Sequence, residues 1–272
     1  MASPTAGTEQ VLVERHGTTA RITLNRPDRY NALALELMEA LRDALERVAA
    51  DPGTSVIVLA GAGRGFSAGH DLSEMIGREE TFHTDLFAAC TRLMETVHAV
   101  PQPVIARVHG VATAAGCQLV AACDLAVAEA GARLGTPGVR IGLFCTTPMV
   151  PLSRAIGRKR ALQMLLTGDL IDARTARDWG LINDVVPAEA LDDAVDALAA
   201  RIADASPRVV ALGKTAFYDQ VDRSEADAYA VAAPVMAHNA AAPDAQEGMA
   251  AFLEKRRPVG EDRGGPVEEG DG

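Results

Sequence analysis

The chain has 272 residues, 48% of them hydrophobic, and a formal net charge of −11 at pH 7. This length and apolar fraction predict one large folded domain, or one domain with a small helical appendage. The acidic balance argues against nucleic-acid binding, so no nucleic-acid partner is expected. The sequence has neither 18 consecutive apolar residues nor a basic-then-apolar leader, which predicts a cytoplasmic protein with no membrane partner.

Apolar runs and turn residues predict strands that alternate with helices in the first half of the chain. Such alternation implies right-handed crossovers and a mainly parallel sheet, so the fold class is α/β. Asn31 is expected to cap the first of the helices. The expected elements are hairpin strands at 11–13 and 18–24, a helix around 37–48, a strand at 55–60, a short helix after Asp71, a helix around 86–97, a strand at 104–108, a helix ending at Ala122 and a strand at 124–128.

The second half of the chain becomes helical from Pro148 onward. Further helices are expected around 191–202, 207–217, 224–241 and 245–256. The ends of the chain are small, polar or acidic, and we expect disordered tails at 1–8 and 259–272. These patterns predict a core over 9–200 and a C-terminal helical part over 201–258.

Two stretches of small residues each follow a buried strand and lead into a helix. They run from Gly65 to Leu72 and from Val111 to Leu119. Small side chains let a ligand approach the backbone, and the first turn of a helix has N–H groups without intrahelical partners. Two such turns side by side would aim two N–H donors at one oxygen atom, which is an oxyanion hole.

In their order and spacing, several short motifs resemble the crotonase (enoyl-CoA hydratase/isomerase) superfamily. The resemblance extends from Arg21 to Arg256. The motifs are Asn31-Ala32-Leu33, Phe66-Ser67-Ala68-Gly69-His70-Asp71, Gly116-Cys117-Gln118-Leu119, Cys123-Asp124, Leu166-Thr167-Gly168 and Trp179-Gly180-Leu181.

This resemblance implies a spiral of βαβ units with a C-terminal helical part that makes homotrimer or hexamer contacts. It implies an acyl-CoA substrate, with coenzyme A as part of that substrate and no other cofactor or metal. The backbone N–H groups of His70 and Ala115 match the two oxyanion donors. They would polarise the thioester carbonyl and stabilise the enolate formed from it, in fatty-acid metabolism.

The chain departs from the hydratases of this family at both catalytic glutamates. Gln118 and Gly138 stand at those two positions. An amide does not titrate usefully and glycine has no side chain, while each acid/base group contributes about 10²–10⁴-fold in rate. Slow hydratase turnover is therefore expected. With these departures the chain is similar to one subgroup, the mitochondrial type 3 enoyl-CoA hydratase domain-containing proteins.

Restoring both glutamates is expected to raise hydratase activity at least about tenfold, because the two act on one water as a unit. Gln118→Glu is nearly isosteric and should fold. Gly138→Glu carries more risk, since a glycine there with a positive φ would not accept a larger side chain.

Two other residues are candidates to replace the missing acid/base groups. The imidazole of His70 could titrate near neutrality, although its ring could equally pack elsewhere while its N–H serves the oxyanion hole. Cys145 lies where relatives line the acyl pocket, and it is either an ordinary pocket thiol or an activated nucleophile. Together the four cysteines lack metal-ligand spacing, and we expect buried, reduced thiols.

The resemblance also supplies substrate-binding positions. Asp71 is expected to cap the helix that follows it. Lys255, near the end of the last helix, is either a phosphate ligand or a solvated cation. The substrate-binding positions are Arg29, Ala32, Ala68, Asp71, Phe144 and Lys255.

Three functions remain open on these residues. The leading one is an enoyl-CoA hydratase/isomerase-like enzyme, of the lyase class by family, that stabilises an acyl-CoA enolate. The second is a catalytically silent acyl-CoA binding or regulatory protein. The third is an acyl-CoA thioesterase that uses the oxyanion hole with His70 or Cys145.

Overall fold

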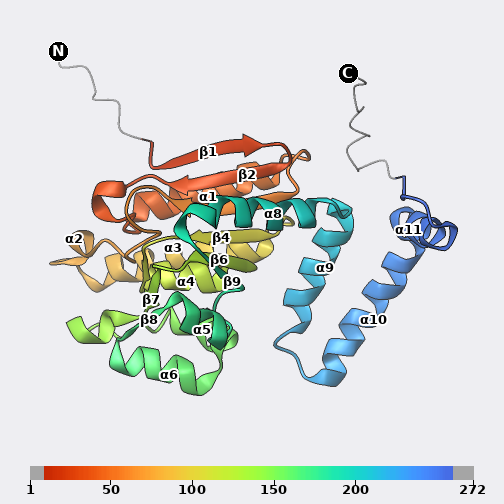
Figure 1. Cartoon of the computed structure of the whole chain (residues 1–272). Coiled ribbons are helices and arrows are strands. Elements are labelled where there is room, and N and C mark those ends of the chain that lie inside the picture. Colours follow the sequence, from red (N-terminus) through yellow and green to blue (C-terminus); the bar gives the residue numbers. More distant parts are fainter. Residues whose placement is uncertain (1–8, 260–272) are drawn as a thin grey trace, which may run out of the picture. The chain divides into compact units, whose positions relative to one another are not determined.

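Residues 9–259 are described by a computed structural model of the chain (Figure 1). Contacts divide the chain into two compact units, the first ending at Ala199 and the second starting at Ala200, inside α8 (Leu191–Ala203). The tails expected at 1–8 and 259–272 lie outside the described residues, apart from Val259.

The main sheet of the first unit has six strands in the order β1-β2-β3-β4-β6-β9 (Figure 1). β1 and β2 form an antiparallel hairpin, and every later pair is parallel. This confirms the expected hairpin and mainly parallel sheet. The strands are β1 (Val11–His16), β2 (Thr19–Leu24), β3 (Val56–Gly61), β4 (Val104–Val108), β6 (Leu125–Glu129) and β9 (Asp184–Val186).

Burial along these strands follows their place in the sheet. β3 lies between two parallel neighbours and is buried along five of its six residues, so it is apolar throughout. β1 lies at the edge and is exposed along five of six residues. The carboxyl end of β3 and that of β4 lead into the two small-residue turns.

A second sheet joins β5 (Val111–Thr113), β7 (Arg133–Gly135) and β8 (Leu170–Asp172). β5 and β7 are parallel, and β7 and β8 are antiparallel. The prediction that the chain is helical from Pro148 onward is wrong at β8 and β9. Each of these strands has three residues, which is too short for a period-2 pattern to show.

The helices of the first unit pack their apolar faces on the sheet and on one another. Leu37, Leu41 and Leu45 of α1 are fully buried, and α1 contacts β1, β2 and α3. The helices are α1 (Leu35–Ala49), α2 (Leu72–Met75), α3 (Glu80–Ala99), α4 (Ala115–Ala122), α5 (Met149–Ile156), α6 (Arg158–Thr167) and α7 (Ala173–Trp179), with 3₁₀ turns η1 (Pro27–Arg29), η2 (Pro137–Ile141) and η3 (Ala188–Ala190).

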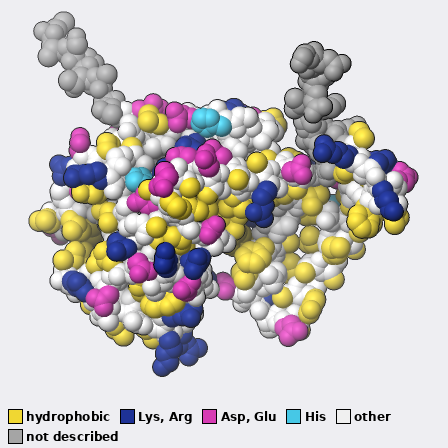
Figure 2. Space-filling model, viewed as in Figure 1, with side chains coloured by type: hydrophobic (Ala, Val, Ile, Leu, Met, Phe, Trp, Pro, Cys, Tyr) yellow, Lys and Arg dark blue, Asp and Glu magenta, His cyan; other side chains and the backbone are white. Residues whose placement is uncertain are grey.

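The second unit contains α9 (Pro207–Gln220), α10 (Glu225–Ala241) and α11 (Pro243–Glu254). Neither α9 nor α10 has a buried residue, and apolar side chains are visible on their surface in Figure 2. The most exposed large ones in this unit are Phe217, Val221, Tyr229, Met236, Met249, Phe252, Leu253 and Val259. Within residues 9–259, no helix combines the length and apolar character needed to cross a membrane.

Candidate active site

The two small-residue turns lie side by side. Ser67 forms a parallel bridge with Ala112, its N–H donates to the Val111 carbonyl at 3.1 Å, and its carbonyl accepts from the Thr113 N–H at 2.9 Å. A Cβ on Gly116 would stand only 2.3 Å from the Ser67 carbonyl oxygen. The close approach of the two turns therefore requires glycine at this position.

The first turn leaves the His70 N–H without a partner. Leu33 donates its N–H to the Gly69 carbonyl at 2.7 Å, and Asp71 donates its N–H to the Leu33 carbonyl at 3.4 Å. Because successive residues of an extended segment face opposite sides, the N–H of His70 points away from Leu33. Among residues 9–259 it has no hydrogen-bond acceptor.

The second turn presents the Ala115 N–H in the same place. Ala115 begins α4, so its N–H has no acceptor within the helix, and no other described residue accepts from it. A Cβ on Gly69 would lie 3.2 Å from the Ala115 nitrogen, which places the residue before His70 against this donor. Two unpaired N–H groups thus come from touching segments, the arrangement that an oxyanion hole needs.

Ala114 carries backbone strain at this point. Its φ of 50° and ψ of −118° lie in a region that favours glycine, and a conformation of this kind costs about 1–3 kcal/mol. Its N–H donates to the Gly135 carbonyl at 2.8 Å, which ties the turn to β7.

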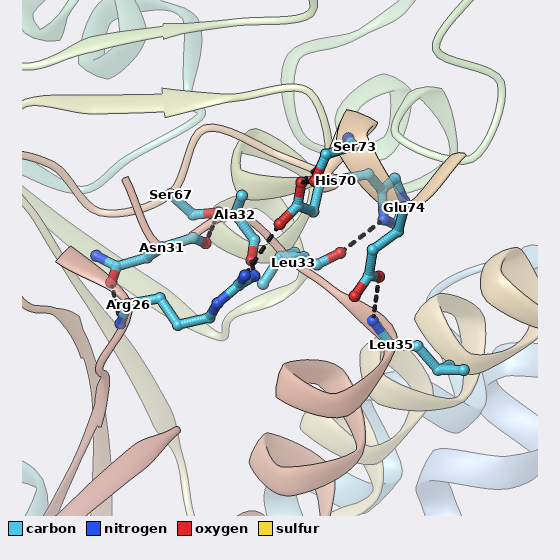
Figure 3. A network of polar contacts seen from close by, with 10 residues as sticks. Arg26, Asn31, Ala32, Leu33, Leu35, Ser67, His70, Ser73 and Glu74 are labelled. Atoms are coloured by element: carbon cyan, nitrogen blue, oxygen red, sulfur yellow. Dashed lines mark hydrogen bonds and ion pairs between the residues drawn. The ribbon is translucent and has the colours of Figure 1, made fainter. Parts of the chain in front are cut away.

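A polar network supports the first turn (Figure 3). The Asn31 amide donates to the carbonyls of Ala62, Gly65 and Phe66, and the Asn31 carbonyl accepts from the Ser67 hydroxyl. The expectation that Asn31 caps α1 is therefore wrong. Asn31 has a φ of 51°, and its side chain holds the turn instead.

The N-terminus of α1 is capped by a residue from another helix. Glu74 of α2 accepts the N–H of Leu35, the first residue of α1, at 3.1 Å (Figure 3). No local pattern predicts this contact, because the two residues are 39 positions apart and only the fold brings them together.

Asp71 caps α2, as its position predicts. Its carboxylate accepts the Ser73 N–H at 3.1 Å, the Ser73 hydroxyl at 2.6 Å and the Arg26 guanidinium at 3.0 Å. Burial acts to raise the pKa of Asp71, but the bonds from Ser73 and Arg26 outweigh it and hold the pKa below its ordinary value. Since its oxygens are occupied, this carboxylate is poorly placed to act as a base.

The His70 ring packs beside the turn. Nδ1 lies 3.3 Å from the Leu33 carbonyl, a contact that places the proton on Nδ1, and the ring meets the Phe87 ring edge-on at 5.3 Å. Burial lowers the pKa of His70, against the opposing effect of the Leu33 bond, so the ring is neutral at pH 7. The buried Nε2 has no hydrogen-bond partner among residues 9–259.

Gly138 stands where a side chain cannot be placed. A Cβ there would lie 2.2 Å from the Leu143 carbonyl oxygen and 2.8 Å from the Cys145 Sγ. The loop is held by the Leu143 N–H, which donates to the Gly138 carbonyl at 2.9 Å. The expected risk of a positive φ is wrong, since Gly138 is outside the left-handed region. The obstacle to a side chain at position 138 is the folded loop.

The cysteines are all buried and free, as expected. Burial raises the pKa of Cys145, against an opposing hydrogen bond from Gly138, so the thiol stays protonated near neutral pH. This environment favours the interpretation of Cys145 as a pocket thiol over an activated nucleophile.

The remaining predicted residues are distributed between the two units. Arg29 and Ala68 are exposed near the first turn, and Ala32 is buried, with its carbonyl accepting from Arg26. Phe144 is 40% exposed on the loop after η2. Lys255 is exposed in the second unit, where it ends α11 with a φ of 54°.

Comparison with known proteins identifies the family. Residues 14–263 match the profile of the enoyl-CoA hydratase/isomerase family. Enoyl-CoA hydratase domain-containing protein 3 of Xenopus laevis is 46% identical over 92% of this chain and 85% of its own length. The protein of that name from Homo sapiens is 43% identical over 88% of this chain and 79% of its own length.

Solved structures agree with this relationship. An enoyl-CoA hydratase of Mycobacterium smegmatis has a TM-score of 0.90 and 47% identity, covering 92% of this chain and 98% of its own. Human enoyl-CoA hydratase domain-containing protein 3 has a TM-score of 0.89 and 41% identity, covering 92% of this chain and 99% of its own.

The same names correct one prediction. The Xenopus, rat and human relatives are named mitochondrial, and this contradicts the expected cytoplasmic location. Composition and hydropathy do not distinguish one aqueous compartment from another and therefore do not predict the cytoplasm. By profile, sequence identity and structure, the chain belongs to the enoyl-CoA hydratase/isomerase family, has the crotonase fold and resembles the type 3 domain-containing subgroup.

Proposed function

We propose that this protein binds an acyl-CoA thioester and stabilises its enolate through the backbone N–H groups of His70 and Ala115, in fatty-acid metabolism. The observation that supports this most is the pair of unpaired N–H groups on touching turns. One donor of this kind contributes about 3 kcal/mol to transition-state stabilisation. The donors belong to the backbone, so the loss of the glutamate side chains leaves them intact.

Hydration of an enoyl thioester is the weaker part of this chemistry. Hydration moves a proton from water and delivers another to the α-carbon, and the positions of the two family glutamates are Gln118 and Gly138. The Leu143 carbonyl and the Cys145 thiol occupy the space that a side chain at 138 would need. We therefore propose binding and enolate stabilisation with slow hydratase turnover.

The phosphates of coenzyme A are negatively charged and need cations to bind them. Because the chain as a whole carries a net charge of −11, these cations must be supplied locally. We assign the exposed Arg29 of the first unit to these phosphates. Arg26 is committed to Asp71 and to the Ala32 carbonyl. Ala32, Ala68 and Phe144 are assigned to the acyl and pantetheine contacts.

A catalytically silent acyl-CoA binder is the second candidate, and the blocked position at Gly138 favours it. A thioesterase is less well supported. Such an enzyme would need an activated nucleophile or base, whereas burial raises the pKa of the Cys145 thiol.

Self-association is part of the proposal. Apolar side chains on α9, α10 and α11 are exposed, and α9 and α10 bury none of their residues. Large exposed apolar patches of this kind mark interaction surfaces. We propose a homotrimer, or a hexamer of two trimers, and light scattering after size-exclusion chromatography measures its mass.

Calorimetric titration with acetyl-, butyryl- and decanoyl-CoA tests the function. The expected result is saturable binding with a Kd on the order of 1 μM, equivalent to about −8 kcal/mol. Free coenzyme A is the control, because it shares every contact except those of the acyl group. Absence of saturable heat with all three thioesters would contradict the proposal.

A further inference from the structure

Gln118 lies over the turn that holds the second oxyanion donor. It follows Ala115 by three residues on α4, and residues so spaced share one face of a helix. Helical side chains lean toward the N-terminus and cover the preceding turn. The Gln118 side chain is therefore directed back toward the Ala114–Ala115 turn, and only 4% of the residue is exposed.

The orientation of the Gln118 amide is set by Cys90 of α3. The Cys90 Sγ lies 3.7 Å from the Gln118 Oε1. Burial raises the pKa of Cys90 to about 12, so the thiol keeps its proton and donates it to that oxygen. The Nε2 group makes no hydrogen bond with any residue from 9 to 259, which leaves its two N–H donors available to a ligand.

Position 118 itself carries an amide, and neither position 138 nor Asp71 supplies a free carboxylate. Position 138 carries no side chain, and the Asp71 carboxylate is bound by Ser73 and Arg26. The N–H donors near this position are the backbone of His70 and Ala115 and the amide of Gln118. These N–H donors attract an acceptor oxygen of a ligand. The carboxylate of a glutamate at 118 would instead repel an acceptor oxygen that carries negative charge.

We propose that Gln118 is a specificity-determining residue whose Nε2 donates to a second acceptor oxygen on the acyl group, the kind carried by 3-oxoacyl and malonyl thioesters. This inference rests on the proposed function. It replaces the proton-transfer role of a glutamate with recognition of an oxygen three bonds from the thioester carbonyl carbon, on the β-carbon of the acyl group. No covalent step is required of Gln118.

Calorimetric titration of the full chain with 3-oxobutyryl-, malonyl- and butyryl-CoA tests the inference. The first two are expected to bind at least about fivefold tighter than butyryl-CoA, the gain from one added hydrogen bond. Gln118→Met keeps the length of the side chain and removes the donor, so the preference should vanish and the three thioesters should bind this variant with similar affinity. Gln163→Met, at an exposed position of α6, is the matched control and should behave as the parent.

The outcomes separate this inference from the proposed function. Equal affinity of the parent for all three thioesters overturns the role of Gln118, even if Gln118→Met does not fold. A preference that survives in Gln118→Met also overturns it. Absence of binding by any thioester, butyryl-CoA included, instead overturns the proposed function. Tighter binding of malonyl-CoA alone identifies a carboxylate as the acceptor. Equally tighter binding of malonyl- and 3-oxobutyryl-CoA shows that Gln118 recognises either kind of acceptor oxygen.

Discussion

The Leu143 carbonyl oxygen stands 2.2 Å from the point that a Cβ on Gly138 would occupy. Real side chains do not approach a backbone oxygen so closely, and this oxygen is held in place by the Leu143 N–H bond to the Gly138 carbonyl. The second glutamate position of the hydratases is thus closed by backbone, in addition to lacking a carboxylate. This contact changes the effect expected of Gln118→Glu and Gly138→Glu, the substitutions that restore the two glutamates.

Gly138→Glu is expected to destabilise the protein and to give no gain in hydration, alone or with Gln118→Glu. Displacing the loop costs about 1–3 kcal/mol, the usual range for overpacking. Gly138→Ala introduces the same Cβ without the carboxylate and should lower the melting temperature similarly. Gln118→Glu should melt close to the parent. A double variant that melts like the parent and hydrates crotonyl-CoA at least about tenfold faster would refute this expectation.

Crotonyl-CoA hydration by the parent is expected to be slow, because neither Gln118 nor Gly138 can transfer a proton to or from water. Loss of the ultraviolet absorbance of the enoyl thioester measures it. The expected turnover lies well below about 10 s⁻¹, the median rate of enzymes. Faster turnover would mean that another residue handles the protons.

Gly116→Ala is expected to separate the two turns, because the added Cβ would stand 2.3 Å from the Ser67 carbonyl. The expected loss is about 1–3 kcal/mol of stability together with weaker butyryl-CoA binding. The matched control is Gly213→Ala in α9, where no atom lies within 4 Å of the new Cβ. Helix propensity predicts a gain there of up to about 1 kcal/mol. Equal effects of the two substitutions would show that the turns do not need this close approach.

Stability is expected to fall as the pH drops below about 6.5, partly through His70. Burial lowers its pKa in the folded state, so the unfolded chain binds the proton first and gains stability as the pH falls. His70→Asn retains an N–H donor for the Leu33 carbonyl and removes the titrating ring. Urea unfolding at pH 7.5 and 5.5 should show a smaller pH-dependent loss in the variant. The same loss in both proteins would contradict this assignment.

The sequence was sufficient to locate the two turns and the elements that carry them. Small residues after buried strands at Gly65 and Val111 define the turns, and alternation of strands and helices defines the sheet. Local pattern also predicted the Asp71 cap, since a capping residue acts on its own helix.

Other features depend on contacts between distant segments, which local pattern does not report. Glu74 caps α1 from 39 residues away, and Asn31 is drawn from its expected cap to the carbonyls of the first turn. The closure of Gly138 depends on how the loop after η2 folds back. The short strand β8 has only its pairing with β7 to define it.

Isotope-edited infrared spectroscopy of bound butyryl-CoA, labelled with ¹³C at the thioester carbonyl, tests the oxyanion hole most directly. Two N–H donors from His70 and Ala115 would polarise the carbonyl, so its stretching band is expected to move to lower wavenumber on binding. The measurement requires binding but no turnover, and therefore does not depend on the missing glutamates. A bound carbonyl band at the frequency of the free thioester in water would contradict the central claim.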